Sequence, residues 1–166
     1  MSTTLTLTPG ALTLEQLQAI HAGGVSLAIA SAARAAILAS AAVVQRAAQG
    51  DAPVYGVNTG FGKLANQRIS QHQLDELQLN LIRSHSVGVG GPLAPPVVRL
   101  MLALKAASLA RGASGVGEAV IDTLIAVYNG GLVPCVPSQG SVGASGDLAP
   151  LAHLARVAVY LAVDPA

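Results

Sequence analysis

Residues 140–153 read Gly-Ser-Val-Gly-Ala-Ser-Gly-Asp-Leu-Ala-Pro-Leu-Ala-His, a glycine-rich loop that leads directly into an apolar helix. The central tripeptide, Ala144-Ser145-Gly146, has the composition needed for a backbone cyclisation. Attack of the Gly146 amide nitrogen on the Ala144 carbonyl carbon closes a five-membered ring with loss of water, and loss of the Ser145 hydroxyl as a second water leaves an exocyclic methylene. Glycine suits the attacking position because it has no Cβ to obstruct so tight a bend. The loop can therefore supply an electrophile, and Asp147 can hydrogen-bond to the ring or take up protons.

The same loop also fits a simpler role. Gly140, Gly143 and Gly146 in front of a helix are typical of a helix N-terminus that binds an anion such as phosphate. A Walker-type phosphate loop is excluded because no Gly-Lys-Ser/Thr follows. A dinucleotide-binding loop is disfavoured because Pro134 and Pro137 interrupt the segment where its strand would lie. The tripeptide alone does not decide between an electrophile and an anion site.

Two further motifs precede this loop. They are Tyr55-Gly56-Val57-Asn58-Thr59-Gly60-Phe61-Gly62 and Ser84-His85-Ser86-Val87-Gly88-Val89-Gly90. The three motifs, in this order, resemble the N-terminal third of the aromatic amino acid ammonia-lyases, and the resemblance extends from residues 5–10 to the helix after Asp147. It implies a mainly α fold: an N-terminal helical domain with a short N-terminal strand, formed by residues 1–166 as a single domain, which ends before the family's long central helix bundle.

The resemblance also implies a catalytic site built on these motifs. Ala144, Ser145 and Gly146 would form a 4-methylidene-imidazol-5-one electrophile autocatalytically, with the assistance of Asp147 and without a metal or an external cofactor. Tyr55 would be the base that removes the substrate's β-proton. The residues implied to bind or enclose the substrate are Ser84, His85, Asn58, Thr59, Gly60 and Phe61.

The pair Ser84-His85 carries the expectation about the substrate. In the family this pair lies where the substrate's ring sits, and a histidine at its second position is the pattern of members that act on histidine. The resemblance thus implies conversion of L-histidine to trans-urocanate and ammonia, the first step of histidine degradation, with action on tyrosine or phenylalanine as an alternative. Two structural alternatives also stay open: Tyr55 as a packed aromatic residue with a satisfied hydroxyl, and His85 as a cap at the C-terminal end of the preceding helix.

Local sequence signals predict helices along most of the chain. Thr13 with Gln16 forms a capping box, and Ser70 with Gln73 marks another helix start. The remaining signals are an alanine-rich helix from Ser31 to Gly50, a helix opened by Pro95 and Pro96 that ends near Gly112, a helix from Ser114 to Asn129, and a last helix capped by Asp147. The alternation in residues 2–7 predicts a short strand. The candidate catalytic residues therefore fall in loops and at helix ends.

Composition narrows the classes of partner. Of 166 residues 52% are hydrophobic, 10% are charged and only 2% are aromatic, and the net charge is +1. Neither nucleic acid nor an anionic membrane is an expected partner, because the net charge gives no basic footprint and aromatic residues for base stacking are almost absent. The apolar run at residues 97–110 is interrupted by Arg99 and Lys105, so no transmembrane span is predicted. The mean hydropathy of +0.57 favours a homo-oligomer, a tetramer in the family, that covers apolar helix faces.

Other features favour a cytoplasmic, metal-free protein. Cys135 is the only cysteine, which suits a reducing compartment, and no secretory signal is recognised at the N-terminus. His21, His72 and His153 are isolated and lack the spacing of metal ligands.

The length of the chain departs from the family pattern. Members of the family are several-fold longer, and this sequence stops shortly after the helix that follows the electrophile loop. A truncated, catalytically incomplete piece with only a structural or interaction role is therefore a further expectation to weigh, and a phosphate-binding helix terminus is a weaker one.

Overall fold

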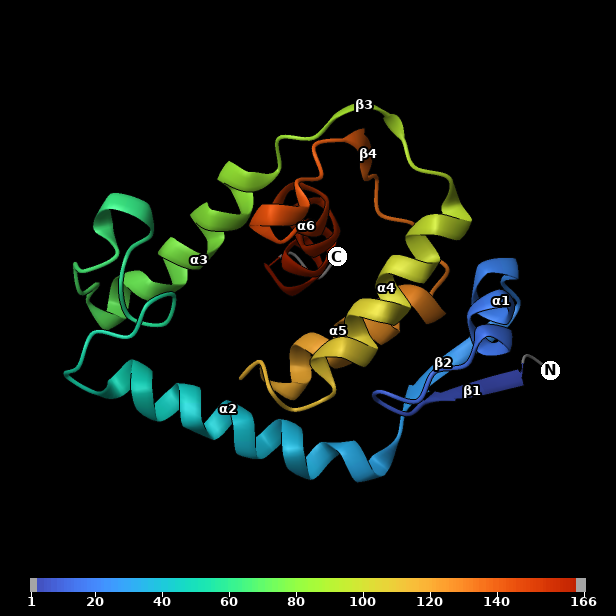
Figure 1. The fold of residues 1–166 in the computed structure, drawn as a ribbon, viewed down its shortest axis with the longest axis horizontal. Coiled ribbons are helices and arrows are strands. Elements are labelled where there is room, and N and C mark those ends of the chain that lie inside the picture. Colours follow the sequence, from blue (N-terminus) through green and yellow to red (C-terminus); the bar gives the residue numbers. More distant parts are fainter. Residues whose placement is uncertain (1–2, 164–166) are drawn as a thin grey trace.

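The N-terminal segment forms a small parallel sheet around one helix. In the computed structural model, which describes residues 3–163, β1 (Thr3–Leu7) pairs in parallel with β2 (Val25–Ile29). α1 (Leu14–Ala22) makes the crossover between the two strands (Figure 1). The Thr13 hydroxyl accepts a hydrogen bond from the Gln16 N–H, and the Gln16 side chain accepts one from the Thr13 N–H. The predicted N-terminal strand and the predicted capping box are both confirmed.

A side chain continues the hydrogen bonding of β2. The Leu27 N–H donates to Asn129 Oδ1 at 2.7 Å, and Asn129 Nδ2 donates back to the Leu27 carbonyl at 2.9 Å. Asn129 is the last residue of α5 (Glu118–Asn129), so this pair of bonds fixes the end of α5 against the sheet.

α4 (Pro95–Leu109) and α5 form the centre of the hydrophobic core. Pro95 and Pro96 occupy the first turn of α4, as predicted, because the N–H groups that proline lacks have no helical partner there. Side chains from both helices, from β1 and α1, and from the segment before β4 fill one contiguous cluster. Its fully buried large members include Leu7, Ile20, Val98, Leu102, Ile121 and Val136.

α2 (Arg34–Gln49) follows a 3-10 turn at Ser31–Ala33 and ends at Gly50, as predicted. It lies along one edge of the molecule (Figure 1). Arg34 at its start pairs with Glu118 at 3.0 Å and with Asp122 at 2.7 Å, both on α5. Because all three side chains are about one-third exposed or more, these ion pairs orient α2 more than they stabilise it.

The predicted start of α5 is wrong by several residues: the helix begins at Glu118, not at Ser114. Gly115 has a left-handed backbone with φ of +75°, which a right-handed helix does not accommodate. Its N–H donates to Ser40 Oγ at 2.8 Å, and a Cβ built on it would collide with the Val44 side chain. The loop before α5 is therefore shaped by close contact with α2.

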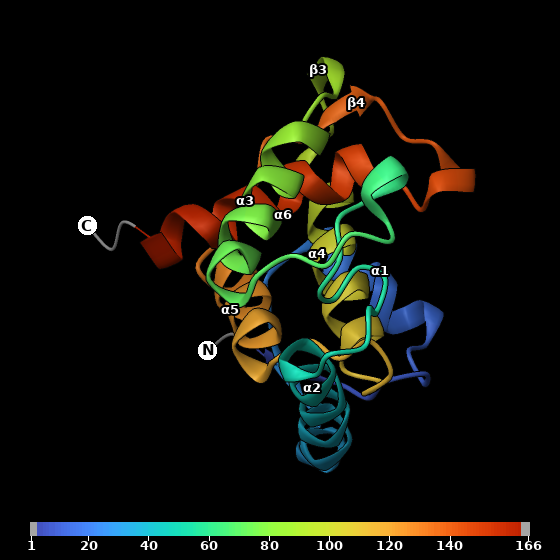
Figure 2. The same cartoon turned by 90° about the vertical axis from the view of Figure 1, so that its left-hand side faces the viewer.

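α3 (Gln71–His85) packs against α6 (Leu148–Val163), as Figure 2 shows. An antiparallel ribbon of β3 (Val89–Pro92) and β4 (Pro137–Gln139) lies between them in the chain. α3 begins after Ser70 as predicted, but the Ser70 hydroxyl donates to Gln73 Oε1 rather than bonding the helix backbone. This packing brings the loop that follows α3 close to the loop that precedes α6. Within residues 3–163, no helix is long and apolar enough to cross a membrane.

Candidate functional site

A single carbonyl group organises the loop at residues 140–147. The Val142 oxygen accepts hydrogen bonds from the N–H of Ser145 at 3.0 Å, from the N–H of Asp147 at 3.1 Å and from Ser145 Oγ at 2.8 Å. Gly143–Ser145 form a 3-10 turn, and Gly146 follows with φ of 85° and ψ of 28°. The Ala-Ser-Gly tripeptide thus lies in a tight, exposed turn that its own backbone holds in place.

The residues of this turn fit the ring-forming role. A Cβ built on Gly146 would meet nothing within 4 Å, so glycine is needed there for its left-handed conformation and not for space. The Ser145 hydroxyl is exposed and bonded only within the turn. The Gly146 N–H donates to the Gly143 carbonyl at 3.1 Å, and cyclisation requires this bond to break before the nitrogen turns toward Ala144.

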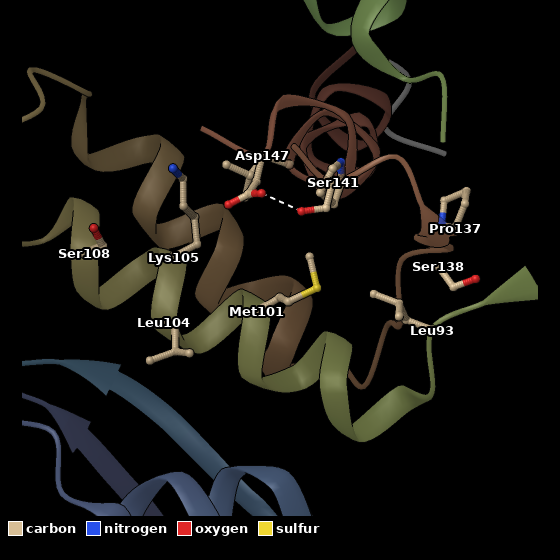
Figure 3. A pocket seen from close by; sticks show the side chains of 11 residues that line it. Leu93, Met101, Leu104, Lys105, Ser108, Pro137, Ser138, Ser141 and Asp147 are labelled. Carbon is tan, nitrogen blue, oxygen red and sulfur yellow. Dashed lines mark hydrogen bonds between the residues drawn. The ribbon is translucent and has the colours of Figure 1, made fainter. Parts of the chain in front are cut away.

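Asp147 differs from the helix cap that was predicted. Its main-chain carbonyl accepts from the Leu151 N–H, but its carboxylate accepts from Ser141 Oγ at 2.5 Å and bonds no helix N–H among the described residues. With φ of 57°, it is the only non-glycine residue of the described chain in the left-handed region. Asp147, Ser141 and Lys105 all line a cavity of about 500 Å³, in which the Asp147 carboxylate is turned toward Ser141 (Figure 3). The carboxylate is therefore held beside the tripeptide by Ser141.

A second cavity, of about 620 Å³, brings the three sequence motifs together. Tyr55 and Phe61 come from the first motif, His85 from the second and Ser145 from the third. The remaining wall is mostly apolar and comes from α3 and α6, and its members are Leu81, Ile82, Leu148, Leu151, Ala152 and Ala155, with Gly62 and Lys105 at its border. We call this the motif cavity. Its mixture of apolar walls and a few polar groups is typical of a small-molecule site.

Tyr55 and Phe61 form the aromatic part of this cavity. Their rings meet edge to face, with centroids 5.7 Å apart and an interplanar angle of 76°. Tyr55 is 64% exposed, and its hydroxyl has no hydrogen-bond partner within residues 3–163. The alternative of a packed tyrosine with a satisfied hydroxyl does not describe this side chain.

His85 is the last residue of α3 and also lines the motif cavity. Its Nδ1 lies 2.8 Å from the Leu81 carbonyl oxygen, which has only lone pairs to offer, so Nδ1 carries a proton. In the neutral ring Nε2 is then an acceptor. Ser84 Oγ donates to the same carbonyl at 3.0 Å and is exposed outside the cavity wall. His85 therefore both bonds a carbonyl at the end of α3 and lines the motif cavity, whereas Ser84 does not line it.

Asn58, Thr59 and Gly60 lie behind the cavity rather than in its wall. Asn58 is 1% exposed; its Nδ2 donates to the carbonyls of Ala47 and Ala52, and its Oδ1 accepts from the Val54 N–H at 2.7 Å. Thr59, also 1% exposed, donates its hydroxyl to the Gly60 carbonyl at 3.0 Å. Through these hydrogen bonds, Asn58 and Thr59 hold the loop that carries Tyr55 and Phe61.

Replacing Asn58 by alanine is expected to destabilise this loop. The change leaves a buried N–H and several carbonyls without their partner, at a cost of about 1–3 kcal/mol in the free energy of unfolding. Asn66 is an exposed asparagine a few residues away, and Asn66→Ala is the matched control. Urea titration of both variants measures the difference, and equal stability of the two would contradict the structural role of Asn58.

Lys105 is the residue that the sequence analysis missed as a site candidate. It lies on α4 and borders both the motif cavity and the cavity beside Asp147. In the sequence it appeared only as an interruption of an apolar run. The sequence signal that could have identified it is its spacing of four residues from Met101, which also lines the cavity beside Asp147. Residues at this spacing share one helix face.

Among the described residues there is no cluster of three His, Cys, Asp or Glu side chains that could hold a metal ion.

Comparison with known proteins identifies relatives of the whole segment. A family model described as "Aromatic amino acid lyase" matches residues 12–159. A histidine ammonia-lyase from Paracidovorax citrulli is 56% identical over 156 residues, which are 94% of this chain and 30% of that protein. Among solved structures, a histidine ammonia-lyase from Trypanosoma cruzi has a TM-score of 0.82 at 42% identity, over 92% of this chain and 28% of its own. A tyrosine aminomutase from Streptomyces globisporus has a TM-score of 0.84 at 32% identity, over the same shares. The chain thus spans about 30% of the length of the curated relatives it matches.

Proposed function

This chain belongs to the aromatic amino acid lyase family, and on that premise we propose that it supplies the N-terminal part of an enzyme that eliminates ammonia from L-histidine to give trans-urocanate. The mainly α fold with few strands that the resemblance implied is confirmed. The observation that carries the proposal is the meeting of Tyr55, His85 and Ser145, from three distant motifs, at the motif cavity. Identity of 56% to a histidine ammonia-lyase favours histidine as the substrate.

The elimination breaks the bond between the α-carbon and the amine and removes a proton from the β-carbon, and the electron pair of that C–H bond forms the double bond. Tyr55 is the proposed base, because it lines the cavity and its hydroxyl is not engaged elsewhere among the described residues. His85 is proposed to hold the substrate's imidazole, through its Nε2 acceptor or, after a ring adjustment, as a donor. The apolar wall from α3 and α6 keeps water from the reacting carbons.

Ala144, Ser145 and Gly146 are proposed to form the 4-methylidene-imidazol-5-one group by losing two waters, with Asp147 accepting a proton during closure. Once formed, this group supplies an electrophile that draws electrons from the substrate, which no unmodified side chain does. No metal is included in the proposal. We further propose a cytoplasmic location, and a homo-oligomer, a tetramer as in the family, that covers exposed apolar side chains such as Leu38, Val43 and Val120.

The test uses a family-length protein, in which this segment replaces the corresponding part of the Paracidovorax citrulli relative. We expect it to convert L-histidine to urocanate, followed by absorbance. A folded family-length protein without this activity would contradict the proposed function. It would favour instead a catalytically incomplete piece with a structural role.

Replacing His85 by leucine tests the choice of substrate. The change leaves a polar atom of the bound imidazole unpaired, which costs about 1–3 kcal/mol, so kcat/KM for histidine is expected to fall roughly 5- to 150-fold. Relative activity on phenylalanine and tyrosine should rise. The control is Gln78→Ala, which alters an exposed residue of α3 outside the cavity wall and should leave the ratio of the three specificity constants unchanged. An unchanged ratio in His85→Leu would reduce His85 to a helix-end residue.

A further inference from the structure

A hydrogen bond joins two segments that the sequence analysis did not connect. The Gly88 N–H donates to His153 Nε2 at 3.0 Å, across 65 residues of chain. An imidazole nitrogen that accepts from an N–H carries no proton of its own, so His153 is neutral here with its proton on Nδ1. Gly88 lies three residues after His85, and His153 lies on α6, next to Ala152 of the motif cavity.

Close packing surrounds this bond. A Cβ built on Gly88 would lie 3.1 Å from His153 Nε2, 3.1 Å from Pro137 Cβ and 3.2 Å from the Gln139 oxygen. A Cβ built on Gly140, whose φ is +131°, would lie 3.1 Å from the Gly88 Cα. The loop after α3, the end of β4 and α6 therefore meet at one point, which we call the Gly88 junction. A side chain at either glycine would require its neighbours to move by a few tenths of an ångström, and at Gly140 the positive φ also favours glycine.

The junction lies between the two halves of the proposed site. Gly88 follows the residue proposed to hold the imidazole, and Gly140 leads into the loop that carries Ser145. A shift of either segment would change the distance between His85 and the tripeptide, and misplacement of about 1 Å can lower a catalytic rate about 100-fold.

We propose that His153 is a positioning residue, whose neutral imidazole fixes the loop carrying His85 against the electrophile loop. This proposal rests on the proposed lyase function. His153 lines neither of the two cavities at the site, so its effect is transmitted through the Gly88 N–H and the strand pairing of Val89 with Gln139.

The charge surroundings of His153 favour the neutral form. Burial, followed by the positive charge of Arg156 on the same helix, lowers the pKa of His153 below its ordinary value of about 6.5. Residues 89–92 and 137–139 of the ribbon carry no ionisable side chain. α3 and α5 also pack against α6. The last turn of α3 carries Arg83 and His85, and the two acidic residues of α5, Glu118 and Asp122, are paired with Arg34. Protonation at acid pH gives Nε2 a hydrogen that faces the Gly88 N–H, and the bond is lost.

The sign of the pH effect follows from this lowered pKa. The unfolded chain takes up a proton on His153 near pH 6.5, before the folded chain does. The stabilisation from the neutral ring is therefore complete above that pH. It is lost as the pH falls through the lower pKa of the folded protein.

Three variants of the family-length protein test the proposal. His153→Leu removes the acceptor, His153→Gln retains an acceptor oxygen that does not titrate, and His72→Leu is a control at an exposed histidine on α3. In His153→Leu we expect kcat for histidine to fall about 10- to 100-fold with a smaller change in KM, and hydrogen exchange at residues 86–90 to accelerate. The mass loss from ring formation should persist, since the tripeptide turn does not contact His153 through any described hydrogen bond. His153→Gln should restore most of kcat.

A second readout serves if His153→Leu does not fold. The protection of residues 86–90, measured as the intrinsic exchange rate divided by the observed rate at the same pH, should fall on acidification in the parent and should not do so in His153→Gln. Parent-like kcat and exchange in His153→Leu, or the same acid response in His153→Gln, would overturn the proposal. A parent without histidine turnover would overturn the proposed function instead, whereas the exchange measurement still reports on the junction.

Discussion

Replacing Ser145 by alanine is expected to abolish histidine turnover in the family-length protein and to leave its fold intact. The hydroxyl of Ser145 is the second water that leaves when the methylene forms, and alanine has nothing to lose at this position. The side chain is exposed, and its one hydrogen bond, to the Val142 carbonyl, stays within the turn. We therefore expect a change in unfolding free energy of under about 1 kcal/mol.

Measurement of the intact mass shows whether the ring has formed, independently of whether the protein folds. The parent should weigh about 36 Da less than its sequence predicts, because two waters leave without a break in the chain. Ser145→Ala cannot lose the second water and should lack the full mass loss. Ser114→Ala, at an exposed serine in the loop before α5, is the control and should keep both the mass loss and the activity. Normal turnover in Ser145→Ala would remove the tripeptide from the mechanism.

Local chemistry made much of the candidate site predictable. Three adjacent residues supply the small residue, the leaving hydroxyl and the unobstructed nitrogen that ring formation needs, and the structure places Gly146 in a left-handed conformation that glycine adopts readily. Helix starts at Thr13 and Pro95 depend on neighbours within one turn, so they were predictable as well. The short strand at Val25–Ile29 also carries a readable alternation, but it was not predicted.

Roles set by tertiary contacts were not predictable in the same way. Asn58 belongs to a motif expected to shape the pocket, yet its side chain donates to one carbonyl in the last turn of α2 and to another in the segment after it. His153 looked isolated because its partner Gly88 lies 65 residues away. Lys105 reaches two cavities only because α3 and α6 pack together beside α4. In each case the function of the residue depends on a neighbour that periodicity and capping rules do not identify.

The second large effect is expected from Tyr55→Phe. If Tyr55 is the base, the variant retains the ring but has no oxygen to take the β-proton, and kcat should fall about 10²- to 10⁴-fold. The electrophile should still form, so the mass loss of about 36 Da should persist in Tyr55→Phe, unlike in Ser145→Ala. Folding should be little affected, because the tyrosine is 64% exposed and its contact with Phe61 uses the ring and not the hydroxyl.

Tyr128→Phe is the matched control for this experiment. Tyr128 is buried in the core, where desolvation raises the pKa of its hydroxyl, and its only described hydrogen bond is a long one of 3.5 Å to the Ile20 carbonyl. Removing that hydroxyl should leave histidine turnover unchanged, because Tyr128 borders neither cavity at the site. Comparing kcat and intact mass in the two variants isolates proton removal from ring formation. If Tyr55→Phe keeps near-normal kcat while its mass loss is complete, the base is not Tyr55 and must come from outside this segment or from another residue of the motif cavity.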